Sequence, residues 1–136
     1  MAEATRRSTG GCLCGKVRYA VAGQLRDVIA CHCGQCRRQH GHHGAYSEAA
    51  LADLSFEDES GLAWYDSSAK ARRGFCRHCG AGLFWHRAGA ERIAIAAGSL
   101  DRPTGLRLVR HIYADDKGDY YEIADGLPQL PGSQSG

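Results

Sequence analysis

Seven cysteines in three short clusters constrain the fold of this 136-residue chain more than any other feature. Their pattern is Cys12-x-Cys14, Cys31-x-Cys33-x-x-Cys36 and Cys76-x-x-Cys79. An odd number of cysteines would leave one thiol outside a disulfide framework. Short spacings of this kind are typical of metal ligands instead, so we expect bound metal to help hold the chain together.

The first and third clusters predict a closed metal site. In an extended segment residues i and i+2 point the same way, so Cys12 and Cys14 can bind one ion together. The segment "CRHCG" has the form of a thiolate knuckle, in which Gly80 can adopt a positive φ. Four thiolates from two separated pairs make a tetrahedral zinc site of the structural type. The alternative is that these residues are buried free cysteines. The predicted ligands are Cys12, Cys14, Cys76 and Cys79.

The middle cluster, "CHCGQC", supplies three more thiols. Zinc with three protein ligands and a fourth position left to water or substrate is typical of catalytic sites. We therefore predict a second zinc ion at Cys31, Cys33 and Cys36, which makes two ions per chain. Three alternatives remain open at this point: a redox pair with a spare thiol, a site closed by a histidine, and a different partition of the seven cysteines.

Histidines bear directly on the second alternative. In an extended segment His32 would point away from the metal that its two neighbours bind. Three histidines follow closely in "QHGHHG", near enough for one to reach the ion. We expect His78 to be an exposed spacer and His86 and His111 to have structural roles. The three candidate fourth ligands are His40, His42 and His43.

Composition excludes several classes of partner. The formal net charge is +2, and no basic stripe with interleaved aromatic residues occurs, which argues against nucleic acid. No apolar run approaches the length of a membrane span. The first residues carry two arginines without an apolar stretch behind them, unlike a secretory signal. We therefore expect a cytoplasmic protein with reduced cysteines and no membrane contact.

Apolar periodicity predicts a chain of short β-strands. Alternation is clear at Val17, Tyr19 and Val21, and again at Ile93 and Ile95. The segment after Cys33 lacks strand character and predicts a turn or a short helix. The result is an all-β fold, mainly antiparallel, with few short helices. Strands are expected within 16–21, 25–30, 43–49, 62–67, 70–76, 82–87, 91–97, 106–114 and 119–124.

Five sequence blocks, in order and spacing, resemble the glutathione-dependent formaldehyde-activating enzyme (GFA) family, also known as the centromere-protein-V domain family. The blocks are "GGCLCGKVRY", "CHCGQCRR", "RGFCRHCGAGLFW", "AAGSLD" and "HIYADDKGDYYEI". The resemblance implies a zinc-stabilised β-tent of short antiparallel sheets and the same partition of the cysteines into a structural and a catalytic zinc site. We expect a flexible N-terminus at 1–9, a single GFA-type domain at 10–128 and a flexible tail at 129–136.

The resemblance also implies a carbon–sulfur lyase that adds a small thiol, such as glutathione, to an aldehyde such as formaldehyde, or catalyses the reverse. The alternative is a non-catalytic, zinc-stapled thiol-binding or interaction module. Ala81 stands where the family usually has threonine, and the histidine-rich "QHGHHGAY" is unusual. A glutathione-like ligand carries carboxylates that need cationic partners, for which Arg72 and Arg73 are further candidates. Expected substrate contacts and proton carriers are Arg37, Arg38, His42, His43 and Tyr46.

Overall fold

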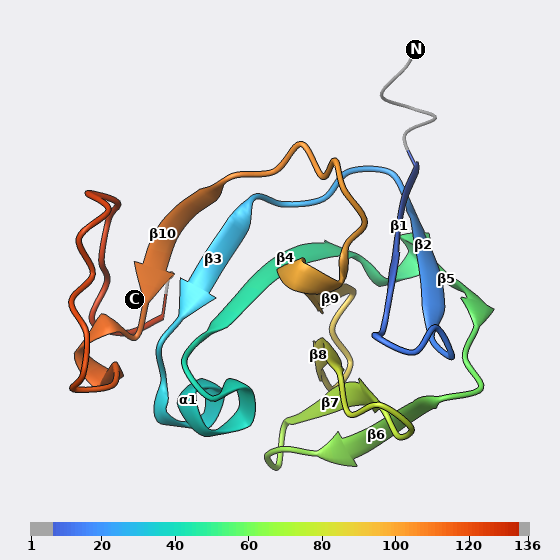
Figure 1. Cartoon of the computed structure of the whole chain (residues 1–136), viewed down its shortest axis with the longest axis horizontal. Coiled ribbons are helices and arrows are strands. Elements are labelled where there is room, and N and C mark those ends of the chain that lie inside the picture. The colour runs from blue at the N-terminus through green and yellow to red at the C-terminus, as the bar shows by residue number, and fades with distance from the viewer. Residues whose placement is uncertain (1–6, 134–136) are drawn as a thin grey trace. The chain divides into compact units, whose positions relative to one another are not determined.

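The computed structural model describes residues 7–133, which form ten strands, one α-helix and three short 3-10 helices (Figure 1). The chain divides into two compact units, and each unit is built from two separate stretches of sequence. The larger unit combines the stretch up to Arg26 with Ser47–Gly105. The smaller unit combines Asp27–Tyr46 with the stretch from Leu106 onward. The predicted mainly-β fold class is confirmed.

Antiparallel strands account for the larger unit. One sheet has the order β1-β2-β5, and the other runs from the second half of β4 through β9, β8 and β7 to β6. The bounds are β1 Arg7–Gly11, β2 Arg18–Ala22, β4 Gly44–Ala50, β5 Leu54–Asp58, β6 Leu62–Asp66, β7 Ala71–Cys76, β8 Gly82–Arg87 and β9 Arg92–Ala96, with 3-10 turns at Leu51–Asp53 and Ala97–Ser99.

Alternating apolar residues of these strands build the core of the larger unit. Tyr19 of β2 is fully buried, and its ring meets Phe84 of β8 edge-on at 5.3 Å between centroids. Trp64 of β6 stacks on the same Phe84 ring at 5.9 Å. Ile93 and Ile95 of β9 are also buried, as their alternation predicts. Burial of aromatic and β-branched side chains therefore stabilises the pleated sheets here.

The smaller unit joins the middle of the chain to its later part. β3 (Val28–Cys31) pairs antiparallel with the first residues of β4 and parallel with β10 (Leu108–Ile112), which lies beside it in Figure 1. The helix α1 (Gly34–His40) connects β3 to β4. It ends at Gly41, whose φ of 81° is left-handed and favours glycine. A 3-10 turn at Ala114–Asp116 follows β10.

Most predicted elements are present, and the exceptions have physical reasons. The strands β1 and β5 were not predicted from the sequence, and the strand predicted at 119–124 is wrong. In that segment the Tyr121 carbonyl accepts from Lys117 Nζ at 2.6 Å, and the Ile123 carbonyl accepts from the Gln129 side chain at 3.3 Å. Side chains thus satisfy acceptors that a strand would pair with a neighbouring backbone. The predicted domain boundaries at 10 and 128 stay a prediction.

No helix in residues 7–133 combines the length and the apolar character that crossing a membrane requires.

Candidate metal centres

The first and third cysteine clusters converge in the larger unit. Cys12 and Cys14 follow β1, Cys76 ends β7, and Cys79 lies in the turn before β8. Their four sulfur atoms all lie within 4.8 Å of one another. Two of the distances, from Cys14 Sγ to Cys12 Sγ and to Cys76 Sγ, are 3.7 Å. The cysteines are free of disulfides, so the four thiols form one group of candidate metal ligands.

Backbone amides of the two turns point at these sulfur atoms. The Val17 N–H donates to Cys12 Sγ at 3.3 Å, and the Cys79 N–H donates to Cys76 Sγ at 3.5 Å. The Gly80 N–H closes the second turn by donating to the Cys76 carbonyl at 2.7 Å, with a φ of 80° at Gly80. A backbone hydrogen bond from Ala81 is the main cause that lowers the pKa of Cys79 to about 6. This contact therefore favours the thiolate form of Cys79, the form that metals bind.

The spacing of the four sulfur atoms fits a tetrahedral ion. Four sulfur atoms each about 2.3 Å from a central zinc would lie ~3.8 Å from one another. The measured 3.7 Å distances match that value. Four cysteine sulfurs leave a tetrahedral ion no further position, so this group has the donor set of a closed site.

The middle cluster lies entirely in the smaller unit. Cys31 ends β3, Cys33 is the residue that precedes α1, and Cys36 lies within that helix. Cys33 caps the helix, because its Sγ accepts from the Cys36 N–H at 3.3 Å. The β3 end and the first helical turn therefore bring the three sulfur atoms within 4.8 Å of one another. This cluster is a second group of candidate metal ligands.

The pKa values of the thiols in this cluster are shifted in opposite directions. Hydrogen bonds first with Cys33 and then with Cys36 raise the pKa of Cys31. Hydrogen bonds first with Cys31 and then with Cys36 lower the pKa of Cys33. The cluster thus favours the loss of one proton and opposes the loss of all three unless a cation compensates the charge. Its chemistry fits a bound divalent metal.

Histidine nitrogens do not complete this group. Among residues 7–133, none comes within 4.8 Å of all three sulfur atoms. His32 is 1% exposed, and its two ring nitrogens contact Tyr121 and His111, as its predicted orientation away from the metal requires. Burial, and then the neighbouring His43, lower the pKa of His32 to about 4. Within the described residues, the structure therefore brings together three sulfur ligands and no fourth protein ligand.

His40 and Tyr46 form a pair beside the cluster; Tyr46 was predicted as a substrate contact or proton carrier, whereas His40 was predicted only as a candidate fourth metal ligand. His40 Nε2 lies 2.6 Å from Tyr46 Oη, so the two side chains share a hydrogen bond. A Cβ atom at Gly44 would lie 2.8 Å from the Tyr46 ring, 3.0 Å from the His40 ring and 3.3 Å from Cys36 Sγ. The pair and Cys36 therefore surround Gly44. In the sequence, the only signal of this arrangement was the glycine at position 44. Its meaning, a close approach of three side chains to the backbone, is visible only in the folded structure.

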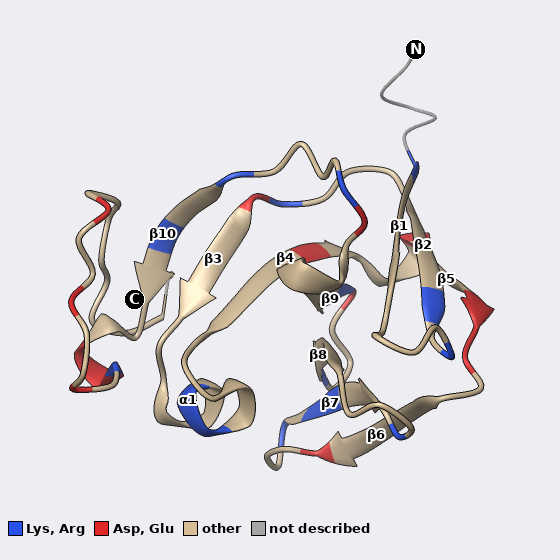
Figure 2. Cartoon of the chain, in the orientation of Figure 1, with Lys and Arg blue, Asp and Glu red and all other residues tan. Residues whose placement is uncertain are grey.

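The other predicted substrate contacts lie on two elements of the smaller unit. Arg37 and Arg38 are in the last turn of α1, which Figure 2 shows as the blue part of that helix. His42 is exposed, and its Nδ1 lies 2.8 Å from Tyr120 Oη. The ring of His43 packs between those of His32 and His42, and its Nδ1 is buried without a partner among the described residues.

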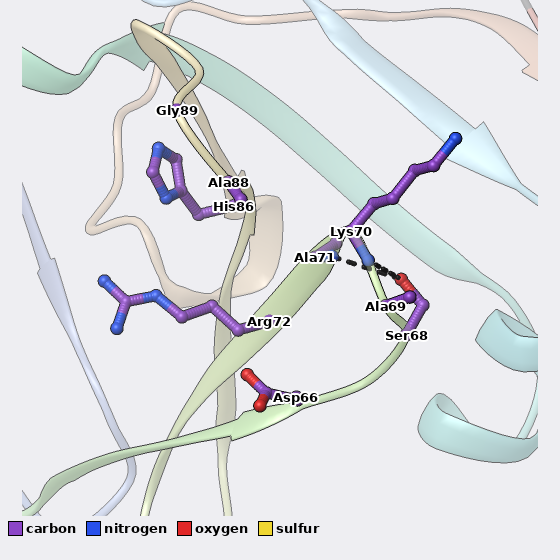
Figure 3. A pocket seen from close by; sticks show the side chains of 9 residues that line it. All are labelled: Asp66, Ser68, Ala69, Lys70, Ala71, Arg72, His86, Ala88 and Gly89. Carbon is purple, nitrogen blue, oxygen red and sulfur yellow. Dashed lines mark hydrogen bonds between the residues drawn. The ribbon is translucent and has the colours of Figure 1, made fainter.

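Arg72 and Arg73 lie on β7 and so belong to the larger unit, whereas the middle cluster belongs to the smaller one. Arg73 is buried, whereas Arg72 stacks over Trp64 at 4.1 Å and lines an open cavity of about 530 Å³ (Figure 3). Lys70, His86 and Asp66 also line the cavity, so it carries charges of both signs. Figure 3 shows Lys70 pointing away from His86 and Arg72.

Comparisons with known proteins place this arrangement in context. A sequence model described as glutathione-dependent formaldehyde-activating enzyme, GFA, matches residues 7–116. A curated protein of Schizosaccharomyces pombe, named as an uncharacterized lyase, is 27% identical over 118 residues, which cover 85% of each chain. The crystal structure of a Rhodobacter sphaeroides protein superposes with a TM-score of 0.60 at 24% identity, covering 89% of this chain and 98% of that one, and shows the same fold.

Proposed function

This chain belongs to the glutathione-dependent formaldehyde-activating enzyme family, and from that premise we propose that it is a zinc-dependent carbon–sulfur lyase. The reaction is the addition of a small thiol, such as glutathione, to an aldehyde, or the reverse. The observation that carries the proposal is the middle cluster, in which three sulfur atoms lie within 4.8 Å of one another and no histidine joins them among residues 7–133. The lyase name of the Schizosaccharomyces pombe relative supports the same reaction class.

The two cysteine groups take different roles in this proposal. Zinc is the metal whose preference for tetrahedral sulfur ligands fits both groups. Cys12, Cys14, Cys76 and Cys79 hold a structural ion. Cys31, Cys33 and Cys36 would hold a second ion, which when bound would favour the thiolate form of an incoming thiol.

Side chains of the smaller unit would bind and orient the substrates. Arg37 and Arg38 follow Cys36 on the same helix and offer guanidinium groups to the carboxylates of a glutathione-like thiol. His42 and His43 are further candidate contacts at the start of β4. Holding thiol and aldehyde side by side converts a bimolecular step into one between oriented neighbours.

The addition also moves protons, and we assign their transfer to the His40–Tyr46 pair. The carbon–sulfur bond forms as the carbonyl π bond breaks, so the thiol gives up a proton and the carbonyl oxygen takes one up. The product is a hemithioacetal, and the reaction neither releases nor consumes protons overall. The 2.6 Å hydrogen bond between His40 Nε2 and Tyr46 Oη, beside Cys36, links two groups that can accept and return a proton.

Exchange NMR of hemithioacetal formation tests the proposal. Thiols and formaldehyde react spontaneously, so the rate with protein is compared with the rate without it. We expect acceleration by the native protein and none by Cys36→Ala. Arg87→Ala, which changes an exposed side chain at the end of β8, is the control and should accelerate the reaction as the native protein does.

Two outcomes of this experiment would contradict the lyase assignment. Saturable glutathione binding without acceleration would show a thiol-binding module rather than an enzyme. The absence of any thiol binding to the metal-loaded protein would show that the fourth position of the middle cluster is not available to a substrate thiol.

A further inference from the structure

A chain of hydrogen bonds, buried at its two histidines, runs from the middle cysteine cluster to the segment after β10. His32, between Cys31 and Cys33, contacts Tyr121 Oη through Nδ1 and His111 Nδ1 through Nε2, the latter at 2.9 Å. His111 Nε2 in turn lies 2.7 Å from Asp125 Oδ2. His32 is 1% exposed and His111 is 4% exposed. All four side chains belong to the smaller unit.

The direction of every bond in this chain follows from its last member. A carboxylate only accepts, so His111 Nε2 carries a proton and donates to Asp125. In a neutral His111 the Nδ1 atom is therefore the acceptor, and His32 Nε2 must donate to it. Nδ1 of a neutral His32 then accepts from the Tyr121 hydroxyl. Each ring nitrogen has one partner and one role, which fixes the tautomer of both histidines.

Asp125 and Tyr121 are themselves held by local contacts. Asp125 Oδ1 accepts from the Leu127 N–H at 3.0 Å. Lys117 Nζ donates to the Tyr121 carbonyl at 2.6 Å and lies 5.1 Å from the centroid of its ring. The backbone of His111 is paired on both sides, from its N–H to the Pro128 carbonyl and from its carbonyl to the Leu130 N–H, each at 2.9 Å. These contacts restrain the far end of the chain of hydrogen bonds.

A fixed His32 restricts both cysteines beside it. Successive side chains of an extended segment point to opposite sides, so a His32 ring anchored inward turns Cys31 and Cys33 the other way. The backbone adds to this restraint, because the His32 N–H donates to the Ile112 carbonyl at 3.0 Å. Rotation of the loop would break these bonds and leave buried nitrogens unpaired, which is unfavourable.

The middle cluster needs such support more than the four-cysteine group does. Its three ligands lie within six residues, so no distant segment of the chain contributes a sulfur ligand to it. We propose that Tyr121, His111 and Asp125 are positioning residues that hold His32, and through it Cys31 and Cys33, in the metal-binding arrangement. The inference rests on the proposed function only in treating the middle cluster as a metal site. Partners of this kind typically change metal affinity about 10–100-fold when they are removed.

The histidine tautomers of the native, metal-loaded protein provide the first test. Long-range ¹H–¹⁵N spectra distinguish an Nε2–H imidazole from an Nδ1–H imidazole. We expect both His32 and His111 to be Nε2–H tautomers at neutral pH. An Nδ1–H tautomer at either residue would reverse the direction of the chain and overturn the inference.

Cobalt affinity provides the second test, with a matched pair of variants. Tyr121→Phe removes the hydroxyl that contacts His32, whereas Tyr120→Phe removes the neighbouring hydroxyl, which contacts exposed His42 instead. Thiolate-bound Co²⁺ absorbs visible light, so competition with a chelator measures the affinity of each site. We expect Tyr121→Phe to lower the affinity of the three-cysteine site about 10-fold or more and to leave the four-cysteine site unchanged.

The controls separate positioning from general loss of structure. Equal weakening of both sites in Tyr121→Phe would indicate a structural effect and overturn the inference. The inference would also be overturned if the cobalt affinity of the three-cysteine site in Tyr121→Phe lay within about twofold of that in Tyr120→Phe. Neither measurement depends on turnover. If the protein shows the expected tautomers and the selective loss of cobalt affinity but does not accelerate hemithioacetal formation, the lyase assignment is refuted and the positioning role is kept.

Discussion

Tyr19 shows how a single side chain couples the core of the larger unit to pH. Its ring is fully buried, and its hydroxyl lies 2.6 Å from Ser99 Oγ. The Ser99 hydroxyl donates to the Ala96 carbonyl at 2.7 Å, so the Tyr19 hydroxyl is the donor to Ser99. Burial is the main cause that raises the pKa of Tyr19 to about 12. The folded protein therefore favours the neutral phenol.

The sign of the resulting pH dependence follows from the raised pKa of Tyr19. An unfolded tyrosine has a pKa of about 10, so this contribution to stability is complete below pH ~10 and is lost as the pH rises through ~12. We expect the free energy of unfolding to fall by about 3 kcal/mol across that range. Urea unfolding at a series of alkaline pH values measures it. Tyr19→Phe should cost about 1 kcal/mol at neutral pH and flatten the alkaline loss; an unchanged alkaline slope in that variant would contradict the assignment.

Two glycines next to the middle cluster differ in the space around them. A Cβ atom at Gly34, the first residue of α1, would meet no atom within 4 Å, whereas one at Gly44 would press on Tyr46, His40 and Cys36. We expect Gly34→Ala to be neutral or to stabilise by up to ~1 kcal/mol, since alanine favours the helix. Gly44→Ala should destabilise by about 1–3 kcal/mol through overpacking. Thermal unfolding measures the melting temperatures of both variants. Equal values would show that the side chains around Gly44 move to accommodate the added methyl group.

At the scale of elements, the two cysteine groups connect different distances along the chain. Cys76 ends β7 and belongs to a group that also includes residues before β2. Cys33 belongs to a group confined to the end of β3 and the first turns of α1. Because metal binding across distant segments contributes to folding, we expect Cys76→Ala to lower the melting temperature more than Cys33→Ala does. Differential scanning calorimetry of the metal-loaded variants makes the comparison, and equal losses would argue against this division of roles.

The strands differ in how far sequence alone predicts them. β2 and β9 could be predicted because large apolar residues alternate in their sequences. The cysteine groups could be predicted because each is built from cysteines at short spacings. The parallel pairing of Ile112 with Cys31 was not predictable, since it joins segments 81 positions apart and leaves no local pattern. The prediction of a strand at 119–124 failed because the apolar pattern there has another cause. The Tyr121 ring is turned inward by the contact of its hydroxyl with His32, not by pairing of a strand.

The molecule as a whole divides its seven thiols between its two units. The larger unit holds the four-cysteine group, and the smaller unit holds the three-cysteine group. A closed site releases its ion more slowly than one with a position open to solvent. We therefore expect two zinc ions of unequal affinity in each chain.

Stepwise chelation checks this expectation. A mild chelator should remove one ion and leave the circular dichroism spectrum unchanged, and a strong chelator should remove the second and unfold at least the larger unit. Elemental analysis of fresh, reduced protein gives the total. A single ion per chain, or simultaneous loss of both with the fold, would contradict the assignment of two distinct sites.

The discontinuous make-up of both units has a consequence for protein synthesis. The three thiols of the middle cluster leave the ribosome together, whereas Cys12 and Cys14 wait for Cys76 and Cys79. In that interval five thiols are available to a single ion, including combinations that the finished protein does not use. The native partition is settled only after residue 79 has emerged, so metal that arrives early must remain exchangeable. In refolding from denaturant, adding zinc after dilution should therefore give a higher yield than adding it before.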